Sequence, residues 1–190
     1  MASLALKFSI ACWCVFYAFW IAVALRAKRT AKADSVAGSV AYRIPLILGV
    51  FLLFSSHRLG VPLATRVIAG GTGLALVSMA MSVMGLVICL WARVTLGRNW
   101  SAVVVVKQDH ELIQAGPYRF VRHPIYTGII MMFSANVLLD GRVGALVGLV
   151  CFIASFQLKL LREEKLMLAE FPGEYPDYCR RVKRLLPFIY

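Results

Sequence analysis

The part of the sequence that decides its organisation is GPYRFVRHPIYTG, residues 116–128. Arg, His, Tyr and Pro side chains gather here and lead into an uncharged run of helix length, residues 125–139. The short link Asp140-Gly141-Arg142 then joins this run to a second apolar run, residues 143–158. Two apolar runs with such a tight link predict an antiparallel helical hairpin. Polar groups gathered where a hydrophobic helix begins indicate a site at a membrane surface.

The composition is that of an all-α integral membrane protein. The 190 residues are 61% hydrophobic and only 16% charged, and the mean hydropathy is +0.77, far from an average soluble domain. The net charge of +12 comes from basic residues in short segments between apolar runs. Membrane topology and anionic headgroups explain this charge better than nucleic acid does. We therefore expect membrane lipids, and no nucleic acid, as partners.

Neither a disulfide framework nor a metal site is expected. The five cysteines show no CxxC and no Cys/His metal spacing, and four of them lie in apolar runs, where small buried thiols are common.

Glycines in the third apolar run predict that its helix packs closely against a neighbour. They are Gly70, Gly71, Gly73 and Gly85. The first apolar run lacks a clear small-residue cleavage site and predicts a retained helix. The sequence leaves the oligomeric state open.

The apolar runs predict about five transmembrane helices. Three precede residue 93 and two form the hairpin, at about 4–25, 43–57, 67–92, 125–139 and 143–165. The second is short: its apolar part, residues 44–56, covers roughly 20 Å at 1.5 Å per residue, against a hydrocarbon core of roughly 30 Å. Whether it fully spans is left open. Pro45 is expected in its first turn, where proline is tolerated.

The distribution of basic residues predicts the orientation. They are dense in residues 26–43, in 93–122 and after 159, and sparse elsewhere. Five spans place all dense segments on one side of the membrane, so the positive-inside rule predicts an outside N-terminus and a cytoplasmic C-terminus.

The hairpin brings distant polar residues together. His123 lies 18 residues before Gly141 and Lys159 lies 18 after it, so both are expected at one depth near the cytoplasmic surface. Glu163 lies one helical turn further out. Arg122, His123, Tyr126, Lys159 and Glu163 are therefore expected to converge. Ordinary membrane anchoring and an i,i+4 ion pair of Lys159 with Glu163 explain the same residues, and the spacing leaves both readings open.

Several motifs resemble the isoprenylcysteine carboxyl methyltransferase family, in the form of its short bacterial-type members. The likeness covers about residues 91–190 and rests on GPY at 116–118, RHPIY at 122–126, the hairpin, Glu163-Glu164, LGRNWS at 96–101 and FPGEYPDY at 171–178. The resemblance implies S-adenosyl-L-methionine as methyl donor, S-adenosyl-L-homocysteine as product, and a lipophilic small-molecule or lipidated acceptor. It divides the chain into N-terminal transmembrane helices, 1–92, and a methyltransferase core, 93–190, whose 93–124 loop, hairpin and cytoplasmic tail form the cofactor pocket.

The resemblance also assigns site residues. It implies cofactor binding by His110, Glu111, Leu112, Ile113, Gly116, Tyr118, His123, Pro124, Ile125, Tyr126, Glu163 and Glu164, and it places Arg122, His123, Tyr126 and Lys159 at the reaction. The eukaryotic enzymes have an arginine, assigned to the substrate carboxylate, where this chain has Lys159. A lysine cannot form the bidentate fork of an arginine. Carboxyl methylation of an isoprenylcysteine-like substrate is the favoured reaction, while thiol, amine and phenol acceptors stay open.

The sequence leaves two other functions open. Membrane sterol reductases share a related C-terminal region and use NADPH, but they are usually much longer and have more spans. A non-catalytic lipid-binding scaffold would need neither cofactor. Binding of a methyl donor, of NADPH or of neither separates the three hypotheses.

Overall fold

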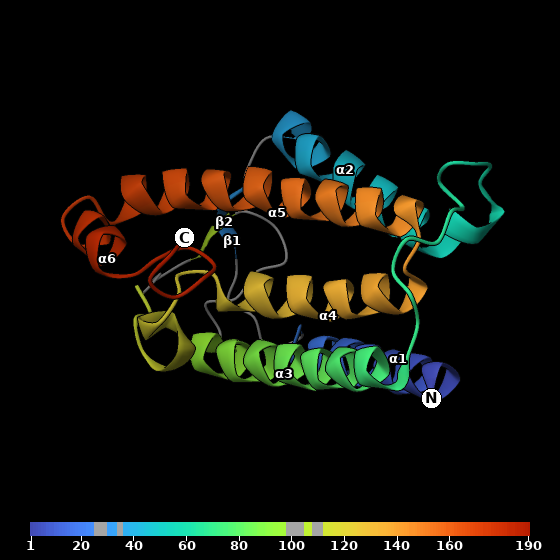
Figure 1. Cartoon of the computed structure of the whole chain (residues 1–190). Coiled ribbons are helices and arrows are strands. Elements are labelled where there is room, and N and C mark those ends of the chain that lie inside the picture. The colour runs from blue at the N-terminus through green and yellow to red at the C-terminus, as the bar shows by residue number, and fades with distance from the viewer. Residues whose placement is uncertain (25–29, 34–35, 98–104, 108–111) are drawn as a thin grey trace.

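The structure, a computed structural model, describes residues 1–24, 30–33, 36–97, 105–107 and 112–190. Its helices are α1 (Ala2–Ala24), α2 (Val36–Ser55), α3 (Thr72–Leu96), α4 (Pro124–Asp140), α5 (Val143–Glu170) and α6 (Tyr175–Arg181). Short 3₁₀ helices in the described part of the chain include η1 (Ser56–Arg58) and η3 (Gly116–Arg119). Figure 1 shows α6 and the C-terminus at the end of the bundle where α4 begins, and the N-terminus at the opposite end.

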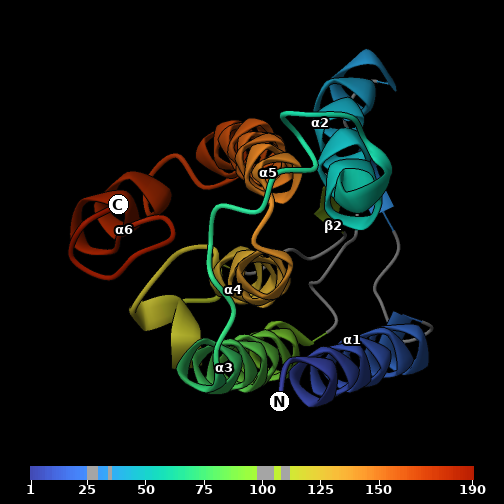
Figure 2. The ribbon, with the colours of Figure 1, turned by 45° about the vertical axis from the view of Figure 1, so that its right-hand side comes forward.

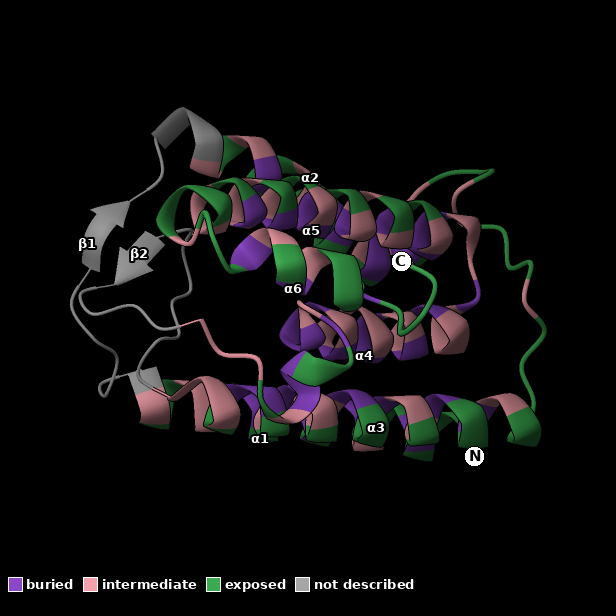
Figure 3. Cartoon of the chain, turned by 90° about the vertical axis from the view of Figure 1, so that its left-hand side faces the viewer, coloured by how far each residue is buried: buried purple, intermediate pink, exposed green. Residues whose placement is uncertain are grey.

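The helices have the length and composition of membrane spans. Within the described residues, four segments are long and apolar enough to cross a bilayer, namely Ala2–Val23, Ser39–Arg58, Thr72–Leu96 and Val143–Glu170. The apolar α4 has 17 residues, at the short end of the roughly 17–25 residues of a transmembrane helix. The outward faces of the helices are largely exposed (Figure 3), with apolar residues such as Ile21, Phe54 and Val94 on them. The prediction of a helical membrane protein is confirmed.

A small antiparallel sheet accompanies the helices. Strand β1 (Thr30–Ala33) pairs with β2 (Val105–Lys107), with Thr30 opposite Lys107 and Ala33 opposite Val105. The sheet joins the segment after α1 to the segment after α3. Two connections that are far apart in the sequence are thereby tied together.

Two helix starts differ from the sequence-based expectation. Helix α2 begins at Val36, so Pro45 lies inside it rather than in its first turn. Packing outweighs the proline: the Ser155 hydroxyl of α5 donates to the carbonyl of Tyr42 at 2.6 Å, in the turn before Pro45.

Helix α3 begins only at Thr72, because the residues near 67, where the sequence predicted its start, instead cross the α4–α5 turn. The amides of Val67 and Ile68 donate to the carbonyl of Gly141 at 2.8 and 3.1 Å.

Two glycine pairs hold the helices in two tight groups. A Cβ atom on Gly128 of α4 would lie 2.5 Å from the Gly85 carbonyl of α3, and one on Gly49 of α2 would lie 2.6 Å from the Gly148 carbonyl of α5. Backbones this close exclude any side chain at these positions. Figure 2 shows the result: α2 lies along α5, while α3 lies along α4 with α1 beside it. The expected close approach holds for Gly85 but not for Gly71 and Gly73, whose Cβ atoms would meet nothing within 4 Å.

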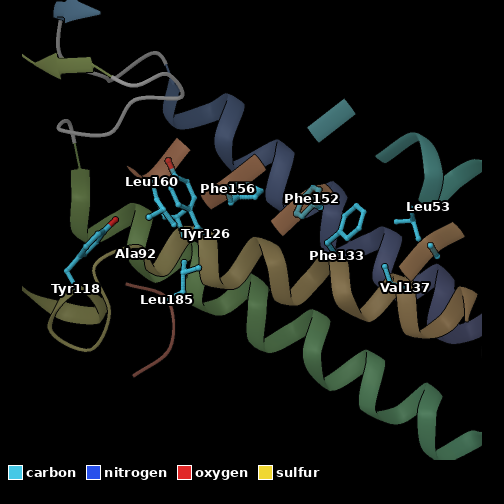
Figure 4. Packing of buried hydrophobic residues seen from close by; sticks show 12 residues of the cluster. Leu53, Ala92, Tyr118, Tyr126, Phe133, Val137, Phe152, Phe156, Leu160 and Leu185 are labelled. Carbon is cyan, nitrogen blue, oxygen red and sulfur yellow. The ribbon is translucent and has the colours of Figure 1, made fainter. Parts of the chain in front are cut away.

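Aromatic side chains fill the seam between α4 and α5. Phe133 and Phe152 stack with ring centroids 3.8 Å apart, Phe152 and Phe156 lie 5.1 Å apart, and Phe156 lies 4.8 Å from Tyr126. Figure 4 shows this column leading from the bundle interior to Tyr126 and Leu160. The apolar seam therefore ends directly beneath the polar residues at the start of α4.

Candidate functional site

The hairpin and the chain after α6 position the start of α4. Gly141 adopts a left-handed conformation, φ 67°, that closes the α4–α5 turn, a position suited to glycine. At the other end, the amides of Arg122 and His123 donate to the carbonyls of Lys183 and Arg184 at 2.7 and 3.0 Å. The Arg122-His123 segment is thus fixed by main-chain hydrogen bonds to a segment 61 residues later.

Glu164 is the centre of a buried ion network. Its Oε1 accepts from Nε and Nη2 of Arg122 at 2.9 and 2.6 Å, and its Oε2 accepts from Nε of Arg184 at 3.0 Å. His123 Nε2 lies 3.4 Å from Oε1. Arg122 also donates to the carbonyls of Cys179 and Val182. The side chains of Arg122 and Glu164 are only 7% and 8% exposed, so this network ties α5, the start of α4 and the tail into one body.

Glu163 faces a different set of partners. The Tyr126 hydroxyl donates to its Oε1, His123 Nδ1 lies 3.7 Å from its Oε2, and Lys159 Nζ lies 4.0 Å from its Oε1. The His123 and Tyr126 rings are parallel, with centroids 5.4 Å apart. With 23% of its side chain exposed, Glu163 is the more accessible of the two glutamates.

Lys159 lies between two tyrosine rings. Its Nζ is 5.2 Å from the centroid of Tyr126 and 5.9 Å from that of Tyr42, both within cation–π range. Tyr42 comes from α2, and the spacing of residues around Gly141 did not predict that it lies at this site. Only the packing of α2 on α5 brings the two residues together. The lysine, both tyrosines and Glu163 together form a polar end to the aromatic seam.

Tyr118 and Gly116 form a wall of the site near α3. Gly116 has a φ of 57°, and a Cβ atom there would lie 2.8 Å from Thr95 Oγ1, so a glycine is required on both counts. The Tyr178 hydroxyl donates to the Tyr118 carbonyl at 2.5 Å. Burial raises the pKa of both phenols. Tyr178 therefore remains protonated and a hydrogen-bond donor at neutral pH.

The remaining predicted cofactor residues fall into three groups. Leu112 packs against a cluster of Tyr175, Tyr178 and Val182, whereas Ile113 packs against the main core. Pro124 is buried in the first turn of α4, and the Ile125 carbonyl accepts from the Cys89 thiol of α3 at 3.5 Å. His110 and Glu111 lie outside the described residues, as do most of LGRNWS.

The structure thus brings Arg122, His123, Tyr126, Lys159 and Glu163 to one end of the bundle. Sequence reasoning missed Tyr42 and also Arg184, because Arg184 is one of several basic residues in the tail and nothing in the sequence sets it apart.

A shallow hollow of about 200 Å³ lies beside the ion network, lined by Arg122, Cys179, Lys183, Arg184, Ile189 and Tyr190. No group of three or more His, Cys, Asp and Glu residues that could hold a metal occurs in the part of the chain that the structure describes.

Comparison with known proteins identifies the family of this chain. The sequence profile of the isoprenylcysteine carboxyl methyltransferase family matches residues 76–170, half of the chain. A protein of Oryza sativa subsp. indica named probable protein-S-isoprenylcysteine O-methyltransferase is 32% identical over 116 residues, 60% of this chain and 61% of the relative. The protein-S-isoprenylcysteine O-methyltransferase of Xenopus laevis is 32% identical over 122 residues, 62% of this chain and 42% of the relative.

A solved structure shares the fold. It is that of a eukaryotic intramembrane Ras methyltransferase, described as isoprenylcysteine carboxyl methyltransferase, and it superposes with a TM-score of 0.55 at 24% identity. The match covers 80% of this chain and 53% of the solved one. This chain therefore matches less than two thirds of the length of each relative named here.

Proposed function

Because the chain belongs to the isoprenylcysteine carboxyl methyltransferase family, we propose that it transfers a methyl group from S-adenosyl-L-methionine to a lipophilic acceptor in the membrane. The observation that carries the proposal is the juxtaposition of two features. Glu163, His123, Tyr126 and Lys159 form a polar cluster, and the aromatic seam of α4 and α5 ends beneath it. We place this cluster at the cytoplasmic face of the membrane, as the basic segments predict, and we expect a bacterial inner membrane from the likeness to the short bacterial-type members of the family.

The polar cluster fits the chemistry of the donor, which supplies an electrophilic methyl group on a sulfonium. Glu163, partly exposed, can accept hydrogen bonds from the donor's ribose hydroxyls or ammonium. The Tyr126 and Tyr118 rings can face the sulfonium by cation–π contact. Arg122 is occupied by Glu164 and two carbonyls, so His123 is favoured over Arg122 for the donor's carboxylate. Leu112 and Ile113 supply apolar surface for the adenine, and His110 and Glu111 complete the loop by family resemblance.

Lys159 is proposed to receive the anionic group of the acceptor. Its ammonium lies where the seam meets the polar cluster, so an acceptor with an apolar chain in the seam presents its head group to Lys159. A carboxylate is ionised at pH 7 and needs no base. The protein then contributes positioning and water exclusion. These features favour carboxyl methylation of an isoprenylcysteine-like substrate.

Methyl transfer is tested in proteoliposomes with labelled donor and an S-prenylated cysteine. We expect label in a base-labile methyl ester, and none when the carboxylate of the acceptor is already esterified. Equal labelling of both acceptors would show that the carboxylate is not the methylated group. Turnover of NADPH with a lipid enone would instead support the reductase hypothesis.

The role of Tyr42 gives a second prediction. Tyr42→Leu removes a ring beside the Lys159 ammonium, whereas Tyr42→Phe keeps the ring. A cation–π contact contributes about 0.5–2 kcal/mol, so we expect Tyr42→Leu to lower kcat/KM for an anionic acceptor roughly twofold to thirtyfold, with Tyr42→Phe close to the parent. The affinity for S-adenosyl-L-homocysteine should be the same in all three proteins. An unchanged kcat/KM in Tyr42→Leu would show that Lys159 does not depend on this ring.

A further inference from the structure

The segment 183–190, here called the hook, exposes apolar side chains although it packs on the bundle. Phe188 is 93% exposed, Ile189 77% and Leu186 50%. The hook is nevertheless held in a defined shape, because the amides of Leu185 and Leu186 both donate to the carbonyl of Tyr190 at 2.7 Å. Its exposed apolar residues are therefore presented by an ordered loop.

Two hydrogen bonds fix the depth of the hook. The Thr127 hydroxyl donates to the Leu185 carbonyl at 2.8 Å, and the Tyr190 hydroxyl donates to Gln157 Oε1 at 2.9 Å. Thr127 follows His123 by one turn into α4, about 6 Å further into the bundle at the helical rise. Gln157 precedes Lys159 by two residues in α5, so Gln157 also lies deeper in the bundle than the polar cluster. The hook therefore reaches past the polar cluster toward the apolar part of the bundle.

Phe188 lies at the tip of a tight turn. It has a φ of 66°, a conformation that a bulky non-glycine residue adopts only at a cost. The turn's own hydrogen bonds hold this backbone, because the amides of Ile189 and Tyr190 donate to the Leu186 carbonyl at 3.2 and 3.1 Å. The turn leaves the Phe188 side chain almost fully exposed, and an apolar medium around that side chain would account for its exposure.

The charges beside the hook identify that medium. Arg180, Arg181 and Lys183 are exposed and immediately precede or begin the hook. Arg180 forms an ion pair with Asp177, and no acidic residue occurs within 178–190, so the excess positive charge beside the hook comes from Arg181 and Lys183. Basic residues next to interfacial apolar side chains match an anionic lipid surface, which attracts each such charge by about 1 kcal/mol. Aromatic and aliphatic side chains at this depth match the boundary of headgroups and acyl chains.

We propose that the hook inserts Leu186, Phe188 and Ile189 into the leaflet beside the site, while Arg181 and Lys183 bind anionic lipid headgroups. The hook also carries Arg184, which pairs with Glu164, and its backbone pairs with Arg122 and His123. Lipid contact at the hook is thereby linked to the position of the site residues.

The test uses tryptophan emission from two variants in lipid bilayers. Phe188→Trp places the probe in the hook, and Glu174→Trp places a control on an exposed position just before α6. Subtracting the parent spectrum isolates the added emission. In phosphatidylglycerol bilayers brominated near the headgroup end of the acyl chain, we expect F188W to lose most of its added emission and E174W to keep it. Quenching should be weaker in phosphatidylcholine.

Two results would overturn the proposal. If aqueous acrylamide quenches the added emission of both variants alike, and brominated lipid quenches neither, the hook is not inserted. If F188W is quenched equally in the two lipids, headgroup charge does not hold the hook and the anionic-lipid assignment is wrong. Unchanged thermal unfolding of both variants in detergent verifies the fold, since both substitutions are at exposed positions.

Discussion

Replacing Glu164 with alanine is expected to destabilise the protein by about 3–5 kcal/mol, because the change removes the partner of a buried charge. Arg122 would keep a guanidinium that is only 7% exposed, with no carboxylate at Nε and Nη2. Arg184 and His123 would lose their shared contact at the same time. The free energy of unfolding, measured by denaturant titration in mixed micelles, is the readout.

The adjacent glutamate is the matched control. Glu163→Gln keeps an acceptor for the Tyr126 hydroxyl and removes a charge that is 23% exposed, so its cost should stay below about 1 kcal/mol. If the two variants unfold at the same denaturant concentration, Glu164 is not the structural anchor. The distinction between the two glutamates would then be wrong.

Replacing Glu163 or His123 with alanine is expected to weaken binding of the methyl donor at least about tenfold, or about 1.4 kcal/mol, while the fold is kept. Both side chains lie at the accessible polar cluster, and each offers the donor a hydrogen bond. Affinity for S-adenosyl-L-homocysteine, measured by calorimetry on detergent-purified protein, is the readout.

Glu163→Gln is expected to give an intermediate affinity for S-adenosyl-L-homocysteine. It retains an oxygen acceptor and should lose less affinity than Glu163→Ala, because a neutral acceptor makes a weaker hydrogen bond than a charged one. Parent-like affinity in both alanine variants would remove Glu163 and His123 from the donor site, whatever the protein binds.

The hairpin was predictable because its determinants are local. Gly141 lies midway between His123 and Lys159, and a tight turn with a fixed rise per residue forces the two to similar depths. The same reasoning placed Glu163 one turn beyond Lys159, where it lies 4.0 Å away in the structure. Local geometry thus predicted which residues of α4 and α5 meet.

The different contacts of Glu163 and Glu164 were not predictable from the motif. Adjacent residues on a helix point about 100° apart, and which of them faces the arginines depends on how the tail folds back. The tail position depends in turn on main-chain hydrogen bonds to Lys183 and Arg184, which no sequence pattern specifies.

The contribution of α2 was hidden for a similar reason. Pro45 suggested a helix start, but the helix continues upstream to Val36 because α2 packs along α5. That extension is what carries Tyr42 to Lys159. Long-range packing overrode a local signal, as it often does for single prolines with compensating contacts.

The most direct test of the proposed function is calorimetric titration of S-adenosyl-L-homocysteine into the detergent-purified protein, with NADPH titrated in parallel. We expect one-to-one binding of S-adenosyl-L-homocysteine with a dissociation constant in the micromolar range, and no heat from NADPH. Absence of S-adenosyl-L-homocysteine binding in protein shown to be folded would contradict the methyltransferase proposal. NADPH binding would then favour a reductase, and binding of neither would favour a lipid-binding scaffold.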